Sequence, residues 1–532
     1  MHFNKVLSTF SLALLSLGPL NSLPVYAMED PEAPSTPVAA PFQTFFEKED
    51  NWNLITELLS PQARKNMSET CHLASNIVRD SRVKKNFSFS MSTIQPTDAD
   101  IFDLFLQKHS QCKDLKISHL NWDFLSASLL RLKEKPFSFS NLESLDLGKN
   151  GITDLMLQEM NQTFFSIMPQ LKTLNLRINN LIEPEGAQHL ATSPHMKNLT
   201  SLDLSNNNIG PIGAQHLATS PHMKNLTSLD LRNNDIRDFG AQHLATSEYM
   251  SNLTSLDLSN THIGPIGAQH LAESLNMSNL TSLDLDFNAI GHEGAHHLAL
   301  SLNMKNLTSL HLSHNNIGPI GAQHLALSPH MRNLTSLNLG FNGIGDIGAQ
   351  HLATSPHMKN LTSLDLSHNN IGPIGAQHLA TSEYMSNLTS LNLCWNGIGP
   401  EGVQHLATSE YMRILTSLDL SSNRIGDVGA QHFATSPHMK NLTSLDLNNN
   451  DIGDFGAQHL ATSEYMSNLT SLNLCWNGIR PEGAQHLANS PFMKNLTSLD
   501  LRNNDIGDFG AQHFAKSLDM HKLIPGRTLQ LR

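Results

Sequence analysis

The chain has 532 residues and a formal net charge of −13 at pH 7, and 29 of its residues are histidine. This acidic balance argues against nucleic acid as a partner, because phosphate binding needs a basic stripe that the sequence lacks. The length is too great for one compact core, whereas a repeat array grows linearly and escapes that limit. Protonation of the histidines would reverse the sign of the surface charge as the pH falls from 7 towards 5.

Residues 1–27 have the pattern of a secretory signal peptide. Lys5 gives a short basic start, an apolar run extends from Val6 to Leu20, and Val-Tyr-Ala ends at Ala27. The apolar run is too short to cross a bilayer, and no later segment is apolar for long enough. The pattern predicts an exported protein, secreted or periplasmic, without a membrane span in the mature chain.

The next segment, 28–41, is rich in Pro, Ala, Ser and Glu, which predicts a flexible linker. Residues 42–111 then show helical patterns, for example at 68–83 and 98–108, and predict a small helical domain. Such a domain would cap the apolar end that a repeat array exposes.

Part of this helical region resembles an F-box. It contains Leu58-Leu59-Ser60-Pro61, then Cys-His-Leu and Val-Arg-Asp-Ser-Arg-Val within 71–83, which is similar to the later portion of that motif. The resemblance implies that Leu58, Leu59 and Pro61 contact the Skp adaptor of a ubiquitin ligase while repeats hold a substrate. The Leu-Pro pair that begins an F-box is missing, with Glu-Lys in its place. A cap without adaptor binding is the alternative.

A 27-residue unit dominates the rest of the chain, with its first regular copy at 198–224. Two looser copies begin at Leu142 and Leu171, so that 142–522 holds fourteen repeats of 27–29 residues. A degenerate first repeat is predicted at 112–141, and a remnant of a C-terminal cap at 523–532. A fixed period of this length indicates units that each stack on their neighbours.

Each unit is predicted to contain a strand and a helix. Leu202 and Leu204 alternate with polar residues, as in a strand with one buried face, and apolar residues recur at helical spacing within 213–219, after a Gly-Pro break. Alternating strands and helices require parallel strands with right-handed crossovers. Because strands stack at roughly 4.8 Å and helices at about 8–10 Å, the predicted α/β solenoid curves into a horseshoe with a concave sheet and convex helices.

The repeat pattern L-x-x-L-x-L-x-x-N-x-I-G-x-x-G-A-x-x-L-A resembles the leucine-rich repeat of the ribonuclease-inhibitor-like class. Its Gly-Ala-x-x-Leu-Ala segment is also similar to bacterial GALA-type effectors, which combine an F-box with such repeats. The resemblance covers about 142–522 and implies a protein that binds another protein. It does not identify the partner, because the surface residues decide that.

An asparagine recurs where each strand ends, among others at Asn207, Asn234, Asn288 and Asn315. An inward carboxamide at this point would satisfy backbone groups of adjacent turns that would otherwise be buried without partners. We interpret these asparagines as structural. Thr261 interrupts the series, and we expect a locally weaker turn there.

Aspartates share one strand position, among others Asp203, Asp230, Asp257 and Asp284. They are predicted to point from the concave face, where like charges on neighbouring strands repel one another and a cationic partner would relieve the repulsion. Aspartate is also ordinary at this position of the repeat class, so a role without a partner remains open.

Four copies of the repeat carry an aromatic residue where the first has asparagine: Phe287, Phe341, Trp395 and Trp476. Exposed aromatic residues beside a concave sheet are typical of interface hot spots. The alternative is that the rings pack on the neighbouring turn. Because near-identical repeats reflect recent duplication, such differences between copies are more informative about binding than the shared residues.

Other residues suggest chemistry only weakly. His292-Glu293-Gly294-Ala295-His296 fits the H-E-x-x-H zinc motif, but Gly294 is predicted to start a helix, which would leave His292 in the preceding turn. A zinc metallopeptidase is therefore a remote alternative. The histidine row that begins at His216 is predicted to be a solvated ladder. We expect no catalytic, metal or cofactor site.

The cysteines do not predict a disulfide in the repeats. Cys394 and Cys475 lie three units apart, about 14 Å by strand spacing, and are expected to be free thiols. Pairing of Cys71 with Cys112 remains open.

The sequence favours a non-catalytic, monomeric protein-binding module that holds a protein partner on its concave face and adjacent loops. The more specific hypothesis is a secreted effector of a host-associated bacterium that acts as an F-box-like ubiquitin-ligase adaptor. The competing hypothesis is a passive exported or surface scaffold with a helical cap.

Overall fold

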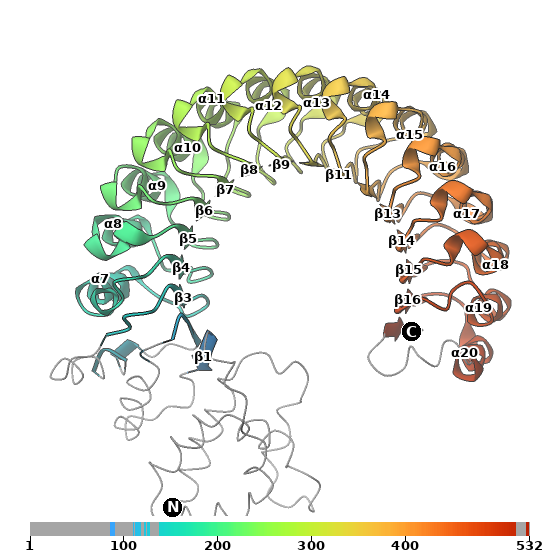
Figure 1. The fold of residues 1–532 in the computed structure, drawn as a ribbon, viewed down its shortest axis with the longest axis horizontal. Coiled ribbons are helices and arrows are strands. Elements are labelled where there is room, and N and C mark those ends of the chain that lie inside the picture. Colours follow the sequence, from blue (N-terminus) through green and yellow to red (C-terminus); the bar gives the residue numbers. More distant parts are fainter. Residues whose placement is uncertain are drawn as a thin grey trace, which may run out of the picture. The chain divides into compact units, whose positions relative to one another are not determined.

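The computed structural model describes residues 138–517, together with 86–90, 110, 112–118, 122–123, 125–127 and 528–530. The chain divides into two compact units, Met1–Asn234 and Asp235–Arg532, and each is considered by itself. In both units a short strand alternates with a helix (Figure 1). The predicted signal peptide, linker and adaptor residues Leu58, Leu59 and Pro61 lie outside the described residues.

In the first unit the described strands form a parallel sheet in which each strand pairs with the next along the chain. The strands are β1 (Asn86–Ser90), β2 (Asp114–Ser118), β3 (Ser144–Asp146), β4 (Thr173–Asn175), β5 (Ser201–Asp203) and β6 (Ser228–Asp230). The helices are α7 (Asp154–Gln162), α8 (Pro184–Thr192) and α9 (Gly210–Ala218), each followed by a 3-10 turn at Phe165–Ile167, Pro194–Asn198 and Pro221–Met223.

In the second unit the strands again pair in parallel, and equivalent residues of successive repeats lie opposite one another. The strands are β7 (Ser255–Asp257), β8 (Ser282–Asp284), β9 (Ser309–His311), β10 (Ser336–Asn338), β11 (Ser363–Asp365), β12 (Ser390–Asn392), β13 (Ser417–Asp419), β14 (Ser444–Asp446), β15 (Ser471–Asn473), β16 (Ser498–Asp500) and β17 (Thr528–Gln530).

The helices of the second unit are α10 (Arg237–Thr246), α11 (Pro265–Glu273), α12 (Gly291–Leu300), α13 (Gly318–Leu327), α14 (Gly345–Thr354), α15 (Pro373–Ala380), α16 (Gly399–Thr408), α17 (Gly426–Thr435), α18 (Asp454–Thr462), α19 (Pro481–Ala488) and α20 (Gly507–Lys516). Strands β7–β16 line the inner side of this unit, and the helices lie on its outer side (Figure 1). None of the helices in the described part of the chain is long and apolar enough to span a membrane.

The core repeats the same contacts in every copy. In the repeat of β8, the strand residue Leu283, the helix residues Ala295 and Leu298 and the 3-10 residue Met304 are all buried. The strand side chains alternate between buried and half-exposed, so the polar residues of each strand face the inner side. The predicted α/β repeat solenoid with a parallel sheet is therefore confirmed.

The predicted start of the helix was wrong. Helix α9 begins at Gly210, three residues before the expected segment, because proline is favoured in a first helical turn, where its missing N–H costs no hydrogen bond. The same shift corrects the position of His292, which lies in the first turn of α12 and not before it.

One segment of the predicted helical domain is a strand. Residues 86–90 lie between the helical patterns expected at 68–83 and 98–108, and they form β1, which pairs in parallel with β2. Their sequence, Asn-Phe-Ser-Phe-Ser, alternates apolar and polar residues with the period of a strand. The sheet of the first unit thus begins before the predicted repeats.

Candidate functional site

Buried asparagines hold the turn that follows each strand. The Nδ2 of Asn288 donates hydrogen bonds to the carbonyl oxygens of Leu258 and Leu285, both at 2.9 Å, and its Oδ1 accepts from the N–H of Ile263 at 2.8 Å. Asn207, Asn234 and Asn315 make equivalent bonds to carbonyl groups of their own and the preceding repeat. The asparagines therefore satisfy buried backbone groups that the irregular turn leaves without partners.

The residue before each of these asparagines has a left-handed backbone conformation. In the second unit φ at this position lies between 51° and 58°. Asparagine tolerates this region. It occupies five of the twelve equivalent positions from Asn206 to Asn503. An aromatic side chain is strained in the same conformation by roughly 1–2 kcal/mol. Phe287, Phe341, Trp395 and Trp476 are thus held at an unfavourable backbone position, which is a feature of functional sites.

Five rings at this position stack on one another in consecutive repeats, and we term Phe287, His314, Phe341, His368 and Trp395 the ring ladder. Successive ring centroids are 4.0, 3.8, 3.6 and 5.2 Å apart, with interplanar angles of 12–18°. The sequence prediction included the three aromatic members and missed both histidines. The sequence does carry a signal for them, because His314 and His368 occupy the same repeat position as the three aromatic residues.

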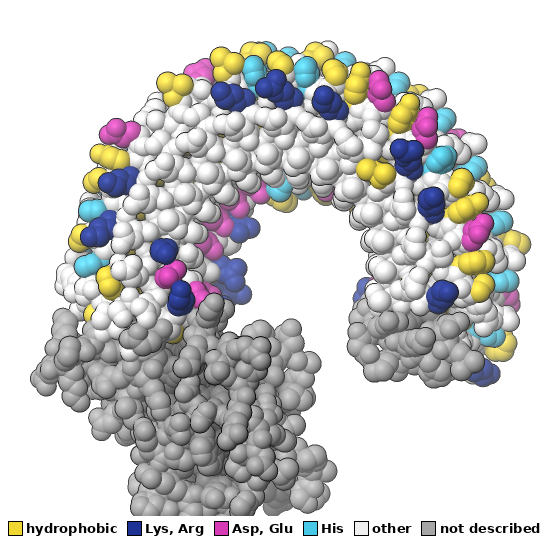
Figure 2. Space-filling view, in the orientation of Figure 1, with side chains coloured by type: hydrophobic (Ala, Val, Ile, Leu, Met, Phe, Trp, Pro, Cys, Tyr) yellow, Lys and Arg dark blue, Asp and Glu magenta, His cyan; other side chains and the backbone are white. Residues whose placement is uncertain are grey.

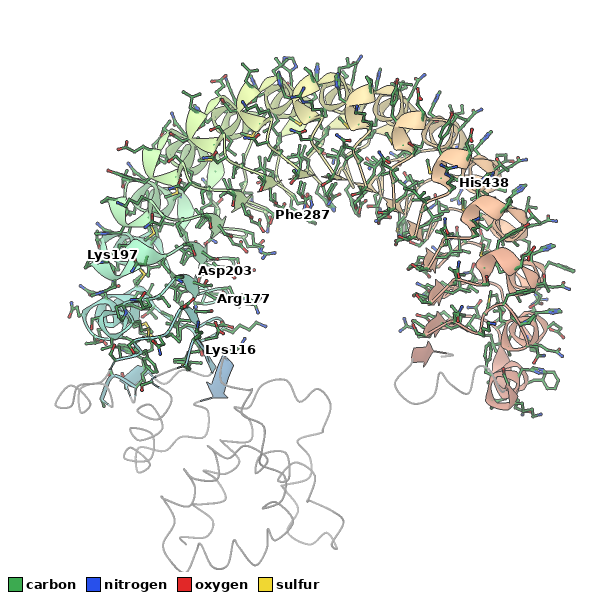
Figure 3. All side chains as sticks on the ribbon, in the orientation of Figure 1. Lys116, Arg177, Lys197, Asp203, Phe287 and His438 are labelled. Atoms are coloured by element: carbon green, nitrogen blue, oxygen red, sulfur yellow. The ribbon has the colours of Figure 1, made fainter. Side chains whose placement is uncertain are left out.

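The ring ladder is packed and exposed at the same time. The faces of its interior rings are covered by neighbouring rings, yet 55% of Phe287, 41% of Phe341 and 56% of Trp395 remain accessible to solvent. Phe287 is on the inner side of the strands (Figure 3). Trp476 is 62% exposed and has no ring contact within residues 138–517. The rings of the ladder therefore pack on one another, as the alternative interpretation expected, and they are also exposed; their contact with a partner stays a prediction.

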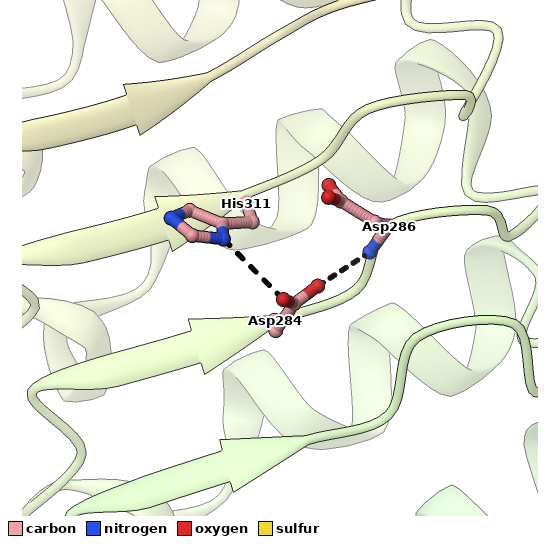
Figure 4. Close-up of side chains that lie close together, drawn as sticks. All are labelled: Asp284, Asp286 and His311. Atoms are coloured by element: carbon pink, nitrogen blue, oxygen red, sulfur yellow. Dashed lines mark hydrogen bonds and ion pairs between the residues drawn. The ribbon is translucent and has the colours of Figure 1, made fainter. Parts of the chain in front are cut away.

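Two aspartates and a histidine, Asp284, Asp286 and His311, lie close together on neighbouring strands (Figure 4). Asp284 accepts a hydrogen bond from the N–H of Asp286 at 2.9 Å, and its second oxygen lies 3.3 Å from Nδ1 of His311. Asp286 accepts from the N–H of Ser313 at 2.5 Å and from Nδ2 of Asn338 at 3.2 Å. Burial, reinforced by the nearby Asp284, raises the pKa of Asp286 to about 7.

The hydrogen bond between His311 and Asp284 affects the protonation of the histidine. It favours the protonated imidazole and raises the pKa of His311 above its usual value, although burial opposes the shift. The group therefore contains a carboxylic acid and a histidine whose pKa values are both raised.

Further carboxylates lie beside one end of the ladder. Asp365 accepts a hydrogen bond from Nδ2 of Asn392 at 2.8 Å. One oxygen of Asp419 accepts from the N–H and hydroxyl of Ser421, and its second oxygen has no hydrogen bond among the described residues. Burial, together with the charge of Asp419, raises the pKa of Asp446.

We term one set of segments the inner strip. It consists of the six residues that start at the first residue of each strand from β7 (255–260) to β15 (471–476). The inner strip contains six aspartates and neither lysine nor arginine. Figure 2 shows acidic side chains on part of the inner surface, with Lys and Arg side chains beside some of them. Outside the strip the same strand position is compensated, because Arg232 pairs with Asp230 and Arg502 with Asp500, each at 2.6 Å. Asp203 in the first unit bonds to its neighbour Ser205.

Two groups of side chains in the described residues bring three potential metal ligands together within 4.8 Å: Asp284, Asp286 and His311, and Asp154, Glu183 and Glu185. His292, Glu293 and His296 do not form such a group, even though α12 carries both histidines. His292 lies 3.5 Å from Glu293, and the ring of His296 contacts that of His324. The side chains of the zinc motif thus contact one another and a neighbouring helix.

The outer side carries an apolar row that sequence reasoning missed. These side chains come from the first turns of the helices, are 53–71% exposed and lie on the outer rim in Figure 2. They are Phe239, Ile266, Ile320, Ile347, Ile374, Val428, Phe455 and Phe509. The signal in the sequence was the apolar residue that directly precedes the glycine of each helix.

Cys112, Cys394 and Cys475 are free, and burial raises the pKa of Cys394 to about 11.

Comparisons with known proteins agree with this repeat architecture. The family model described as "Leucine Rich repeats (2 copies)" matches residues 197–246 and 415–462. The model described as "Leucine Rich repeat" matches 140–155, 249–272, 276–299, 303–326, 330–353, 357–380, 384–407, 465–488 and 492–515. No curated protein matches the chain in sequence. The finer resemblance to the ribonuclease-inhibitor-like class and to GALA-type effectors stays a prediction.

Two solved structures are similar to parts of this chain. An internalin from Listeria monocytogenes is 22% identical, with 63% of this chain and 92% of that chain covered and a TM-score of 0.40. TLR13, in its complex with ssRNA13, is 19% identical, with 85% of this chain and 67% of that chain covered and a TM-score of 0.38.

Proposed function

Because this chain is a leucine-rich-repeat protein, we propose that it is a non-catalytic protein-binding module whose inner strip and ring ladder hold a protein partner. The observation that carries the proposal is the ring ladder. Its three aromatic residues keep strained backbone conformations that cost roughly 1–2 kcal/mol each, and stacking offsets this cost by about 0.5–1.5 kcal/mol for each pair. A partner that covers the exposed ring edges would add the burial energy typical of a hot spot.

The test is retention of a partner by the intact chain. The triple variant Phe287→Asn, Phe341→Asn and Trp395→Asn removes the aromatic rings and installs a residue that the repeat already uses at this position. Phe455→Asn is the matched control, because Phe455 is exposed on the outer side. The proposal expects that the triple variant loses a partner that the control retains. Equal retention by both variants would contradict it.

A finer proposal concerns export and the region before the repeats. Residues 1–27 support export, and the resemblance of Leu58, Leu59 and Pro61 to an F-box supports a secreted effector that recruits a Skp adaptor. The experiment is a pull-down of the purified chain with a eukaryotic Skp adaptor. Loss of binding in a Leu59→Ala, Pro61→Ala double variant supports the adaptor. Absence of binding by the unmodified chain favours the capped, exported scaffold.

A further inference from the structure

The two ends of the ring ladder differ from its middle. Each interior ring has a neighbour on both faces, so only its edge reaches solvent. The terminal rings, Phe287 and Trp395, have a ring neighbour on one face only. Their outer faces are directed towards the adjacent repeats, where the equivalent residues are Asn260 and Ser422 and carry no ring.

Each outer face lies towards a strand that carries an aspartate. Beyond Trp395 this strand is β13 with Asp419, and the N–H of Trp395 donates a hydrogen bond to the carbonyl of Ser421 at 2.8 Å, which joins the two repeats. Beyond Phe287 the strand is β7 with Asp257. At the Trp395 end, the second oxygen of Asp419 accepts no hydrogen bond from the described residues and remains available to a ligand.

We propose that the partner is a basic protein segment that places one arginine or lysine over the outer face of Trp395, beside Asp419, and a second over Phe287, beside Asp257. This inference rests on the proposed function and names the chemistry of the partner. The face of an aromatic ring attracts a cation, most strongly for tryptophan, and arginine can also stack its planar guanidinium there. The adjacent carboxylates would accept charge-assisted hydrogen bonds from the same group.

The charge of the inner strip favours a cation over other ligands. Six aspartates lie on the strip without lysine or arginine, and burial, together with nearby carboxylates, raises the pKa values of Asp286 and Asp446. A cationic segment would relieve this repulsion. The edges of the interior rings are electropositive, so the middle of the ladder suits an uncharged part of the partner.

The geometry also predicts the spacing of the two cations. Successive ring centroids between Phe287 and Trp395 are 4.0, 3.8, 3.6 and 5.2 Å apart, so the centroids of these two rings are at most about 17 Å apart. A cation on each outer face adds roughly 3.5 Å at either end. An extended chain advances about 3.3–3.6 Å per residue, so the two basic residues would be about six to eight positions apart.

The test uses synthetic peptides and the full chain, with affinity measured by calorimetry. The matched peptide has two arginines seven positions apart in a Gly/Ser sequence. One control peptide has glutamate in place of both arginines, and another has the arginines two positions apart. The proposal expects the matched peptide to bind most tightly, by about tenfold over the close pair, because only it engages both ends of the ladder.

Variants of the chain make the test specific. Trp395→Asn and Asp419→Asn should each weaken the matched peptide by about tenfold, the loss expected for one cation–π or charge-assisted contact. Phe455→Asn is the control and should leave the affinity unchanged, because Phe455 is exposed on the outer side. Equal binding of both arginine peptides, or binding insensitive to Trp395→Asn, indicates unspecific charge attraction and overturns the proposal.

The outcomes separate this inference from the proposed function. If no peptide binds while the triple ladder variant still loses its protein partner, the basic segment is wrong and the protein-binding function stands. If the triple variant retains the partner, the proposed function itself fails.

Discussion

The ring of His368 stacks on the ring of Phe341, with the two centroids 3.6 Å apart and an interplanar angle of 16°. Burial lowers the pKa of His368 and of His314, which favours the neutral form of both rings. A neutral imidazole is flat and can lie between two larger rings without the desolvation cost of a charge. The histidines thus make a continuous ladder from aromatic residues that occur only in alternate repeats.

The two tryptophans at the left-handed position should respond differently to replacement by asparagine. Trp476→Asn relieves backbone strain and removes no ring contact, so we expect it to stabilise the protein by about 1 kcal/mol. Trp395→Asn relieves similar strain but loses the stack on His368, so its net effect should be smaller. Urea unfolding of both variants measures the difference. A Trp476→Asn variant less stable than the unmodified chain would contradict the strain argument.

Asn315→Ala should be strongly destabilising. Asn315 is fully buried, and its side chain bonds to the carbonyl oxygens of Leu285 and Ser313 and to the N–H of Ile290. Its loss leaves several buried backbone groups unpaired, at a cost of roughly 2–4 kcal/mol. Asn441→Ala is the control, because Asn441 donates one exposed bond, to Arg413, and should cost about 1 kcal/mol or less. Similar losses in both variants would refute a special role for the buried series.

Thr261→Asn should strengthen the turn that interrupts the asparagine series. The hydroxyl of Thr261 bonds only to its own repeat at Leu258 and to Asn288. The Oδ1 atoms of Asn315 and Asn342 also accept from a backbone N–H of the preceding repeat, and the equivalent donor here is Ile236. We expect slower hydrogen exchange at the amide of Ile236 in the variant, measured by NMR or mass spectrometry. Unchanged exchange would show that the missing carboxamide does not limit this turn.

Asp286 should make the protein less stable as the pH rises. Its folded pKa of about 7 lies above the ordinary value of 3.8, so its stabilising contribution is complete below pH 4 and is lost as the pH rises through 7. Because the side chain is half-exposed, we expect an effect on the order of 1 kcal/mol. Asp286→Asn should flatten the fall in stability between pH 5 and pH 8, as measured by thermal unfolding. Asn448 shows that asparagine fits this repeat position. An unchanged pH profile would contradict the assignment.

Binding of the matched basic peptide should weaken as the pH falls from 8 to 6. Asp286 loses its negative charge in this range, and His311, whose pKa is raised by Asp284, gains a positive charge. Both changes reduce the attraction of the inner strip for a cation. Calorimetry at the two pH values measures the effect, and Asp286→Asn should reduce it. Tighter binding at pH 6 would contradict the proposed chemistry of the site.

Much of the repeat could be predicted from the sequence because its signals are local. The alternation of Leu202 and Leu204 predicted a strand, and the recurrence of Asn207 and its equivalents predicted bonded turns. The start of α9 was misplaced because proline can either end a segment or begin a helix, and only the backbone distinguishes the two. The exposure of Phe287 and Trp395 could be inferred by comparing copies, but their stacking partners could not.

The sequence by itself determined the period, the buried leucine frame and the position in each repeat where variable residues occur. These features follow from the spacing of residues along the chain, because the period of a strand or helix fixes which side chains face the core. Only the tertiary structure decided that residues 27 positions apart touch, because parallel pairing in register brings each turn beside its equivalent. Because of this register, His314 and His368 stack between the aromatic rings of the ladder, and Asp286 lies beside His311. The candidate binding site therefore arises from the stacking of repeats, and no single repeat contains it.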